Sequence, residues 1–196
     1  MFIFDKCETP SHFFKLLPIS KRFMLNNIFC EAIFYLVGIN AYLCGMILYH
    51  GAHSAIETPR IITGGFAKDF GDGFYCTELK EQAIRWSRRY TTPIVTLFDY
   101  KSNATLKQLH FPTMSEVWLD FIVNCRNHIP HDYDIVSGPM ADDQIYNYIS
   151  DYINGILTRE QFWVLAKFKY PTHQINFCTS NALNCLTYIG SEAIHL

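Results

Sequence analysis

The sequence predicts an α+β fold, because two kinds of hydrophobic pattern follow one another along the chain. Short β-branched and aromatic runs, such as Ile94–Tyr100, are typical of strands. Between them lie segments whose apolar residues recur at helical intervals, as do Ile145, Ile149 and Ile153. Of the 196 residues 49% are hydrophobic and 17% charged, which is a core-forming composition. We therefore expect one globular domain with an N-terminal appendage.

The first half of this domain is expected to hold three strands and one helix. A short apolar run over residues 47–49 predicts a strand that ends at His50 and Gly51. A glycine-punctuated turn leads into a second predicted strand, residues 73–76. Thr77 is a suitable N-cap for a helix that continues through Ser87, and residues 94–100 follow as a strand between Pro93 and a polar turn.

The second half alternates helices and strands in the same way. Ser115 is expected to cap a helix over residues 115–125, and Thr158 a helix over residues 158–169. The other expected elements are a strand within residues 132–139, a helix over residues 141–157, a strand over residues 174–179 and a closing helix over residues 181–189. No internal repeat or low-complexity linker interrupts this order.

Charge and cysteine content restrict the possible functions. The formal net charge is −2 and no basic run occurs, so a nucleic-acid target would have to be held locally. The seven cysteines form no C-x-x-C pair, and their odd number argues against a complete disulfide framework and favours a reducing, cytoplasmic compartment. Cys125, His128 and His131 are spaced like metal ligands, but Pro130 breaks a helix there, so structural roles are favoured and no metal is predicted.

Residues 27–48 form an apolar stretch that follows Lys21 and Arg22. Its length approaches that of a membrane span, but Glu31 and two asparagines are costly in hydrocarbon. A buried or docking helix is the favoured interpretation, with a membrane anchor as the alternative. A third possibility is an upstream extension of the reading frame, in which residues before Met46 are dispensable. The expected organisation is an apolar helical extension, residues 1–45, and a functional domain, residues 46–196.

Three sequence motifs occur in an informative order within residues 46–196. They are LYHG at residues 48–51, FGDGFY at residues 70–75 and HQINF at residues 173–177. In this order they resemble the ADP-ribosyltransferase superfamily of the diphtheria-toxin and poly(ADP-ribose) polymerase type. Together with QAIRW, WLDFI and DYDIVSGPMADD, they look most like the bacterial domain-of-unknown-function family 3990, from about Met46 to the C-terminus.

The resemblance implies a split, strongly curved antiparallel sheet pair around an NAD-binding cleft, flanked by helices. His50 matches the histidine that bonds a ribose hydroxyl, and Gly51 matches the glycine whose backbone holds the nicotinamide carboxamide. Glycine suits this role because its missing side chain lets the backbone approach a ligand closely. A strand-ending histidine before a turn glycine is the plainer alternative.

Aromatic residues are expected to enclose the nicotinamide ring. Tyr75 matches the tyrosine that stacks on the ring, and Trp86, eleven residues later, matches the aromatic that covers its other face. Phe70 and Ala83 are expected to line the same site. The alternative is that Tyr75 and Trp86 are core aromatics of a strand and a helix.

Gln174 departs from the family pattern, in which this position is most often glutamate. Its amide could hold a ribose hydroxyl but could not stabilise a developing cation as a carboxylate would. Asp142, Asp143 and Glu160 are therefore candidates for an auxiliary acid or an acceptor-side group. The two aspartates are more simply explained as helix-capping residues.

The resemblance implies an enzyme that uses NAD as its substrate. Because Gln174 lacks charge, we expect mono-ADP-ribosylation of a protein or nucleic-acid acceptor, with His50, Tyr75 and Gln174 as the catalytic set. Small bacterial domains of this kind often act as toxins beside a neutralising antitoxin protein. The alternatives are an NAD glycohydrolase and, in another class, a non-catalytic NAD-binding module or one docked to a membrane through residues 27–48.

Overall fold

A computed structural model of the chain describes residues 45–64, 68–167 and 171–195. The chain divides into two compact units between Gly45 and Met46, and the sheets and helices named below belong to the unit from Met46 onward. Most of the apolar stretch 27–48 lies outside the described residues, but its last three residues, from Met46, belong to a strand. Within the described ranges, no helix has the length and apolar character that a membrane span requires.

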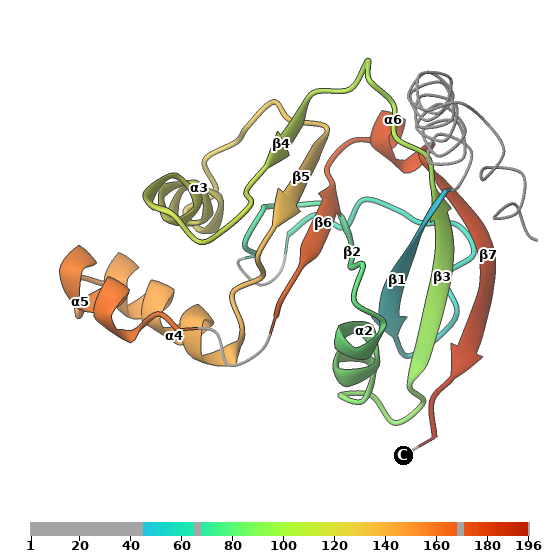
Figure 1. The fold of residues 1–196 in the computed structure, drawn as a ribbon, viewed down its shortest axis with the longest axis horizontal. Coiled ribbons are helices and arrows are strands. Elements are labelled where there is room, and N and C mark those ends of the chain that lie inside the picture. The colour runs from blue at the N-terminus through green and yellow to red at the C-terminus, as the bar shows by residue number, and fades with distance from the viewer. Residues whose placement is uncertain (1–44, 65–67, 168–170, 196) are drawn as a thin grey trace, which may run out of the picture. The chain divides into compact units, whose positions relative to one another are not determined.

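Two β-sheets stand side by side in Figure 1. The first has three antiparallel strands in the order β1-β3-β7, namely β1 (Met46–Ala52), β3 (Ile94–Tyr100) and β7 (Leu186–Ala193). The prediction of a closing helix over residues 181–189 is therefore largely wrong. A short helix, α6 (Ser180–Leu183), turns the chain, and the following residues form the long edge strand β7. The alternating exposure of β7 fits a strand that packs one face on the core.

The second sheet has four strands in the order β2-β6-β5-β4. They are β2 (Phe74–Cys76), β4 (Gln108–His110), β5 (Ile135–Gly138) and β6 (Gln174–Phe177). The strands pair antiparallel except β4 and β5, which run parallel, so the expectation of purely antiparallel sheets is corrected at this edge. The three-residue strand β4 was not expected from the sequence.

Four longer helices flank these sheets. They are α2 (Lys80–Ser87), α3 (Glu116–Arg126), α4 (Asp143–Ile153) and α5 (Arg159–Leu165). Ser115 caps α3 as predicted, and Thr158 caps α5 in a reciprocal capping box with Gln161. The prediction for Thr77 is wrong, because α2 begins after Leu79 and the Thr77 hydroxyl instead accepts a bond from the Leu79 N–H at 3.0 Å.

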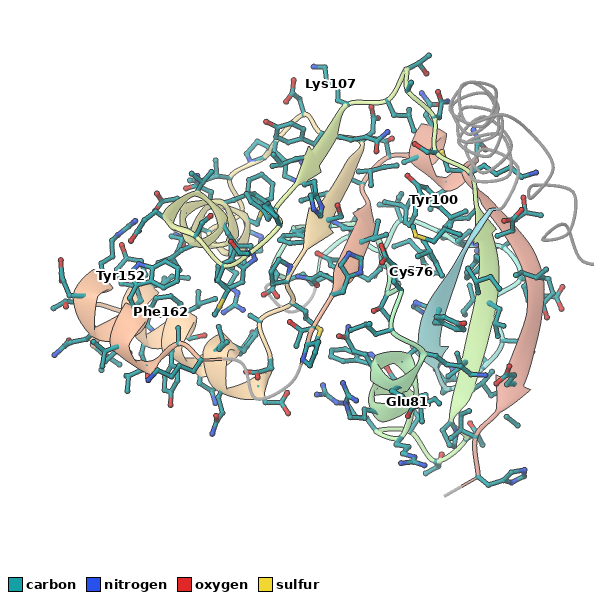
Figure 2. All side chains as sticks on the ribbon, in the orientation of Figure 1. Cys76, Glu81, Tyr100, Lys107, Tyr152 and Phe162 are labelled. Carbon is teal, nitrogen blue, oxygen red and sulfur yellow. The ribbon has the colours of Figure 1, made fainter. Side chains whose placement is uncertain are left out.

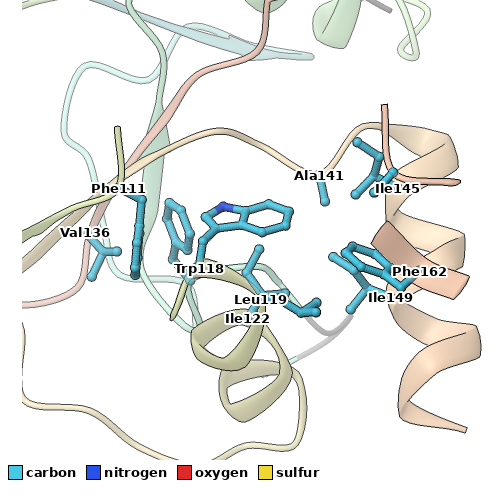
Figure 3. Packing of buried hydrophobic residues seen from close by; sticks show 11 residues of the cluster. Phe111, Trp118, Leu119, Ile122, Val136, Ala141, Ile145, Ile149 and Phe162 are labelled. Carbon is cyan, nitrogen blue, oxygen red and sulfur yellow. The ribbon is translucent and has the colours of Figure 1, made fainter. Parts of the chain in front are cut away.

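One hydrophobic cluster packs the four-stranded sheet against α3, α4 and α5. Figure 3 shows Trp118 of α3 between Phe111 on one side and the side chains of α4 on the other. Trp118 is fully buried, and its indole N–H donates to the carbonyl oxygen of Pro139 at 3.0 Å. The helices are therefore fixed to the strand β5 both by apolar burial and by a satisfied polar group.

A second cluster lies between the two sheets. Its buried members come from both sheets and from α6, and they are Leu48, Phe74, Cys76, Phe98, Ile135, Ile175, Phe177, Ala182, Cys185 and Leu186. Figure 2 labels Cys76 between the strands of the two sheets. A backbone bridge adds to this packing, because Tyr49 and Thr77 exchange two hydrogen bonds of 2.8 and 2.9 Å. The architecture is thus mixed α and β, with two sheets joined at one short bridge.

We predict that a chain lacking residues 1–45 folds on its own. The strand β1 begins at Met46, and Leu48 inside it is the first core residue within the described ranges. Circular dichroism and thermal unfolding should give one cooperative transition for residues 46–196. An insoluble or non-cooperative product would mean that the preceding segment belongs to this core.

Candidate functional site

The strands β1 and β2 separate immediately after their bridge, and this separation creates the candidate site. Tyr49 exchanges its backbone bonds with Thr77, so its N–H and C=O point away from β3. Because backbone direction alternates along an antiparallel strand, the N–H and C=O of Gly51 point to the same side. The register would pair Gly51 with Tyr75, but no described residue forms a backbone hydrogen bond with Gly51 on this side.

His50 occupies the point where the strands separate. Its Nδ1 lies 2.7 Å from the carbonyl oxygen of Tyr75, and its ring stacks on Phe74 with 4.5 Å between ring centres. A carbonyl can only accept, so Nδ1 carries the proton and Nε2 of the neutral ring is an acceptor. Burial lowers the pKa of His50, partly offset by the bond to the Tyr75 carbonyl, which favours this neutral form.

Gly51 is in close contact with α2. A Cβ at this position would lie 2.3 Å from the carbonyl oxygen of Ala83 and 3.0 Å from the backbone nitrogen of Ser87. Ala83 is 2% exposed, so its small side chain is part of the same contact. The structure therefore brings His50, Gly51 and Ala83 together and gives a packing reason for the glycine.

Tyr75 of β2 lies across this junction from Gly51. Its hydroxyl donates to the carbonyl oxygen of Gly71 at 2.7 Å and accepts from the Phe70 N–H at 3.0 Å. Burial, and then the nearby Asp69 carboxylate, raise the pKa of Tyr75 well above its usual value, so the hydroxyl remains a donor. The ammonium of Lys68 lies 5.6 Å from the ring centre. Tyr75 thus holds the loop that precedes β2 while its backbone faces Gly51.

Phe70 does not line this junction. Its side chain is fully buried in the cluster around Trp118, with its ring 5.9 Å from that of Phe111. Phe74, whose ring supports His50, was not among the site residues expected from the sequence. Strand alternation could have identified it, because Phe74 and Tyr75 must lie on opposite faces of β2.

Gln174 is buried beside an ion pair. It is 5% exposed, and its amide nitrogen lies 3.1 Å from Oδ2 of Asp69. The same carboxylate accepts from the Arg126 guanidinium at 2.6 Å and from the Ala141 N–H at 2.9 Å. Gln174 therefore donates to a buried carboxylate, a role that a glutamate could not fill in its charged form.

The rest of β6 extends this arrangement. Ile175 and Phe177 share one face and pack between the sheets, whereas Gln174 and Asn176 share the other. The Asn176 amide donates to the carbonyl oxygens of Phe70 at 2.8 Å and Asp72 at 3.1 Å. The polar face of β6 therefore positions the loop from which Tyr75 emerges.

Trp86 lies at the edge of a separate hollow of about 420 Å³ between α2 and the start of α4. The hollow is lined by Gln82, Arg85, Trp86, Arg89, Met140, Ala141, Asp142, Asp143, Gln144 and Thr172. His50, Gly51 and Tyr75 are not among its lining residues. Trp86 is 42% exposed, and the guanidinium of Arg89 lies 4.1 Å from its ring centre. The structure thus places Trp86 one helical turn beyond the Ala83 contact, on a neighbouring surface.

Gln82 connects this hollow to β6. Its amide donates to the carbonyl oxygen of His173 at 2.5 Å and accepts from the His173 N–H at 3.0 Å. A glutamine side chain can pair with a backbone in this two-way manner, like a strand residue. The pairing fixes α2 against the start of β6, and the sequence analysis missed it.

The three candidate auxiliary acids occupy different places. Asp142 caps α4 by accepting from the Ile145 N–H at 3.0 Å, as the capping interpretation expected. Asp143 is 88% exposed at its side chain and pairs with Arg89 at 2.9 Å. Glu160 lies exposed in the first turn of α5, which Figure 1 shows on the opposite side of α4 from β1. None of these carboxylates is in hydrogen-bond contact with His50 or Gln174 among the described residues.

A second hollow, of about 260 Å³, contains Cys125, His128, His131 and Cys178 beside Lys68. Burial raises the pKa of Cys125 and of Cys178 to about 12, so both remain thiols at neutral pH. Among the described residues, no group of three histidine, cysteine or acidic side chains has a geometry suited to a metal ion. The four cysteines of the described ranges are free.

Comparison with known proteins identifies the family. Residues 46–188 match the sequence model of DUF3990, described as a protein of unknown function, so the chain belongs to this family. No curated protein and no solved structure gives a match. The matched residues begin with β1 and include the whole junction between β1, β2 and α2.

We predict that Gly51→Ala destabilises the fold, whereas Gly190→Ala does not. An added methyl group at Gly51 meets the backbone of α2, and overpacking of this kind costs about 1–3 kcal/mol. Gly190 also lies in a strand but has nothing within 4 Å of its Cβ position. Urea unfolding of both variants measures the difference. Equal stability would show that α2 moves away freely.

We predict a pH-dependent loss of stability for Gln174→Glu. The introduced carboxyl would face Asp69, and this repulsion raises its pKa in the folded state. Below the pKa of a glutamate in the unfolded chain, about 4.3, the new carboxyl is neutral and the variant keeps its free energy of unfolding. As pH rises through the higher pKa of the folded state, the carboxyl becomes charged and this stability is lost. The defect should therefore be largest at neutral pH. Gln174→Met, which removes the donor without adding charge, should show a loss with little pH dependence between pH 4 and 7, roughly. Matching pH profiles for the two variants would argue against the contact.

Proposed function

We propose that this DUF3990 protein is a mono-ADP-ribosyltransferase that cleaves NAD at the junction of β1 and β2. The observation that carries the proposal is the backbone of Gly51, whose N–H and C=O both point away from β3 and form no backbone hydrogen bond with a described residue on that side. A primary carboxamide has one carbonyl acceptor and one amino donor, so it complements such a pair in two hydrogen bonds. The resemblance of LYHG and FGDGFY to the superfamily motifs supports the same assignment.

His50 would position the ribose next to the bound carboxamide. The bond to the Tyr75 carbonyl fixes the tautomer, which leaves Nε2 able to accept from a ribose hydroxyl. Phe74 supports the ring from behind, so the acceptor is held in a fixed direction. Holding the nicotinamide and the ribose rigidly favours cleavage. The reaction passes through an oxocarbenium-like state, which chiefly requires that the leaving ring and the ribose stay in a fixed relative position.

In the proposed reaction the bond between ribose C1′ and the nicotinamide nitrogen breaks, and nicotinamide leaves with the electron pair. A nucleophile on the acceptor forms the new bond to C1′ and releases its proton to solvent. Gln174 donates to Asp69 inside the protein, so no carboxylate at this position would stabilise the developing cation. Transfer of a single unit therefore fits these residues better than polymer synthesis, and water as the nucleophile gives the glycohydrolase alternative.

A non-catalytic NAD-binding module is the second candidate. The observation that favours it is the same burial of Gln174, which leaves the usual acid position without charge. The two candidates differ in turnover rather than in binding. Incubation with nicotinamide-labelled NAD separates them, because only the enzyme releases free nicotinamide.

We predict that His50→Ala lowers release of nicotinamide at least about a hundredfold, the effect of losing one well-placed hydrogen-bonding group. The matched control is His110→Ala, which removes an exposed histidine from β4 in the other sheet and should leave turnover unchanged. Circular dichroism should show that both variants keep the secondary structure of the parent protein. Full activity of His50→Ala would remove this site from consideration.

We also predict that activity is lost only when the pH falls below the usual pKa of histidine. Burial lowers the pKa of His50, so the neutral acceptor form persists below the usual value of about 6.5. As pH falls through the folded pKa, Nε2 becomes protonated and can no longer accept from the ribose. The pH profile of kcat/KM for NAD measures this limb. A limb above pH 7, roughly, would assign the titration to another group.

A further inference from the structure

The end of α2 and the turn that follows it carry an exposed surface of mixed basic and aromatic character. It consists of Arg85, Trp86, Arg88, Arg89 and Tyr90, all of which are exposed, and it is called here the α2 surface. The whole chain has a formal charge of −2 and only 16 lysines and arginines, yet three arginines lie within these positions. Three positive charges are therefore close together in the chain, beside a hollow that Asp142 and Asp143 also line.

Two of these arginines have no neutralising partner among the described residues. Arg89 pairs with Asp143, but both side chains are at least half exposed, so solvent screens the interaction. Arg85 lines the hollow of about 420 Å³, and neither it nor Arg88 forms an ion pair with a described residue. The α2 surface thus presents free guanidinium groups of the kind that bind phosphates.

The aromatic residues of the α2 surface are held in place but are not buried. Trp86 is 42% and Tyr90 is 41% exposed. The Arg89 guanidinium lies 4.1 Å from the Trp86 ring centre, and the His53 ring lies 5.6 Å from that of Tyr90. Each ring therefore has a neighbour that restricts it while much of its area remains open. Such rings are suitable platforms for stacking of unpaired bases.

The α2 surface is next to the candidate NAD site. The carbonyl oxygen of Ala83 marks the contact of α2 with Gly51, and Trp86 follows one helical turn later. The buried side of α2 thus contacts the candidate site, and the α2 surface lies on the exposed side of the same helix and just beyond it. The structure thus combines cations suited to phosphates with open aromatic rings at the end of a helix that contacts Gly51.

We propose that the α2 surface binds single-stranded nucleic acid and presents it as the ADP-ribose acceptor. Its role as an acceptor site rests on the proposed function, whereas binding itself does not. Arg85 and Arg88 contact phosphates, and Tyr90 and Trp86 stack on bases. A duplex keeps its bases stacked internally and cannot use the rings in this way. A nucleophilic atom of the bound strand attacks ribose C1′, nicotinamide leaves, and the displaced proton passes to solvent.

The binding test uses the full chain carrying His50→Ala, without NAD, and fluorescently labelled mixed-sequence oligonucleotides of about 20 nucleotides. Fluorescence anisotropy should show preference for a single strand over the matching duplex. Arg85→Ala with Arg88→Ala should weaken binding about tenfold or more and reduce its salt dependence. Tyr90→Leu should weaken binding about fivefold or more through lost stacking. Lys101→Ala with Lys167→Ala, which removes two exposed cations outside the α2 surface, is the charge-matched control and should change little.

The transfer test uses the parent chain and NAD labelled in its adenylate part. Arg85→Ala with Arg88→Ala should abolish labelling of the oligonucleotide while kcat and KM for NAD hydrolysis without oligonucleotide stay unchanged.

Hydrolysis of NAD without any binding of the oligonucleotide would overturn the inference and leave the proposed function standing. An increased KM for NAD in the double variant would also overturn it, because the arginines would then serve the dinucleotide. Equal binding of duplex and single strand, unaffected by Tyr90→Leu, would reject stacking recognition. Binding of the oligonucleotide without any NAD turnover would reject the proposed function and the acceptor role, but not the binding surface.

Discussion

The buried carboxylate of Asp69 is the interaction on which the arrangement of the candidate site depends. It accepts from Arg126 of α3, from the backbone of Ala141 before α4 and from Gln174 of β6. Three elements that are distant in sequence thus meet at one side chain. A buried charge is tolerated only when its hydrogen bonds are satisfied, so removal of any one partner affects the others. The ring of Tyr146 lies 4.0 Å from the Arg126 guanidinium and further restricts the pair.

This interaction also explains why glutamine suits position 174. The side chain at the head of β6 must donate to a carboxylate, and a glutamine amide can do so. Asn176 lies two residues later on the same face of β6, and its amide donates to two carbonyl oxygens of the loop before β2. The polar face of β6 therefore fixes the path of residues 69–72, and the Tyr75 hydroxyl holds the same loop from the other side.

Helix α2 relates the site to its surroundings through two different contacts. Its buried side packs so closely on Gly51 that no side chain fits there. Gln82 pairs with the backbone of His173 and ties the same helix to β6. With α2 held at both places, β1 and β2 diverge after the Tyr49–Thr77 bridge and leave the Gly51 backbone facing the opening. The exposed arginines and aromatics at the end of α2 lie on a neighbouring surface, around a hollow that His50, Gly51 and Tyr75 do not line.

The sequence by itself determined the local structure wherever a periodic pattern and a cap agreed. The strand Ile94–Tyr100 and the helix capped by Ser115 follow the predictions closely, since β-branched alternation and capping act over a few residues. Strand β7 was mistaken for a helix because its identity depends on pairing with β3, which is distant in sequence. Tertiary structure alone decided that Gln174 faces Asp69, that Phe70 is buried and that Trp86 lies on a neighbouring surface. These outcomes depend on which residues face each other after folding, and local propensity carries no information about that.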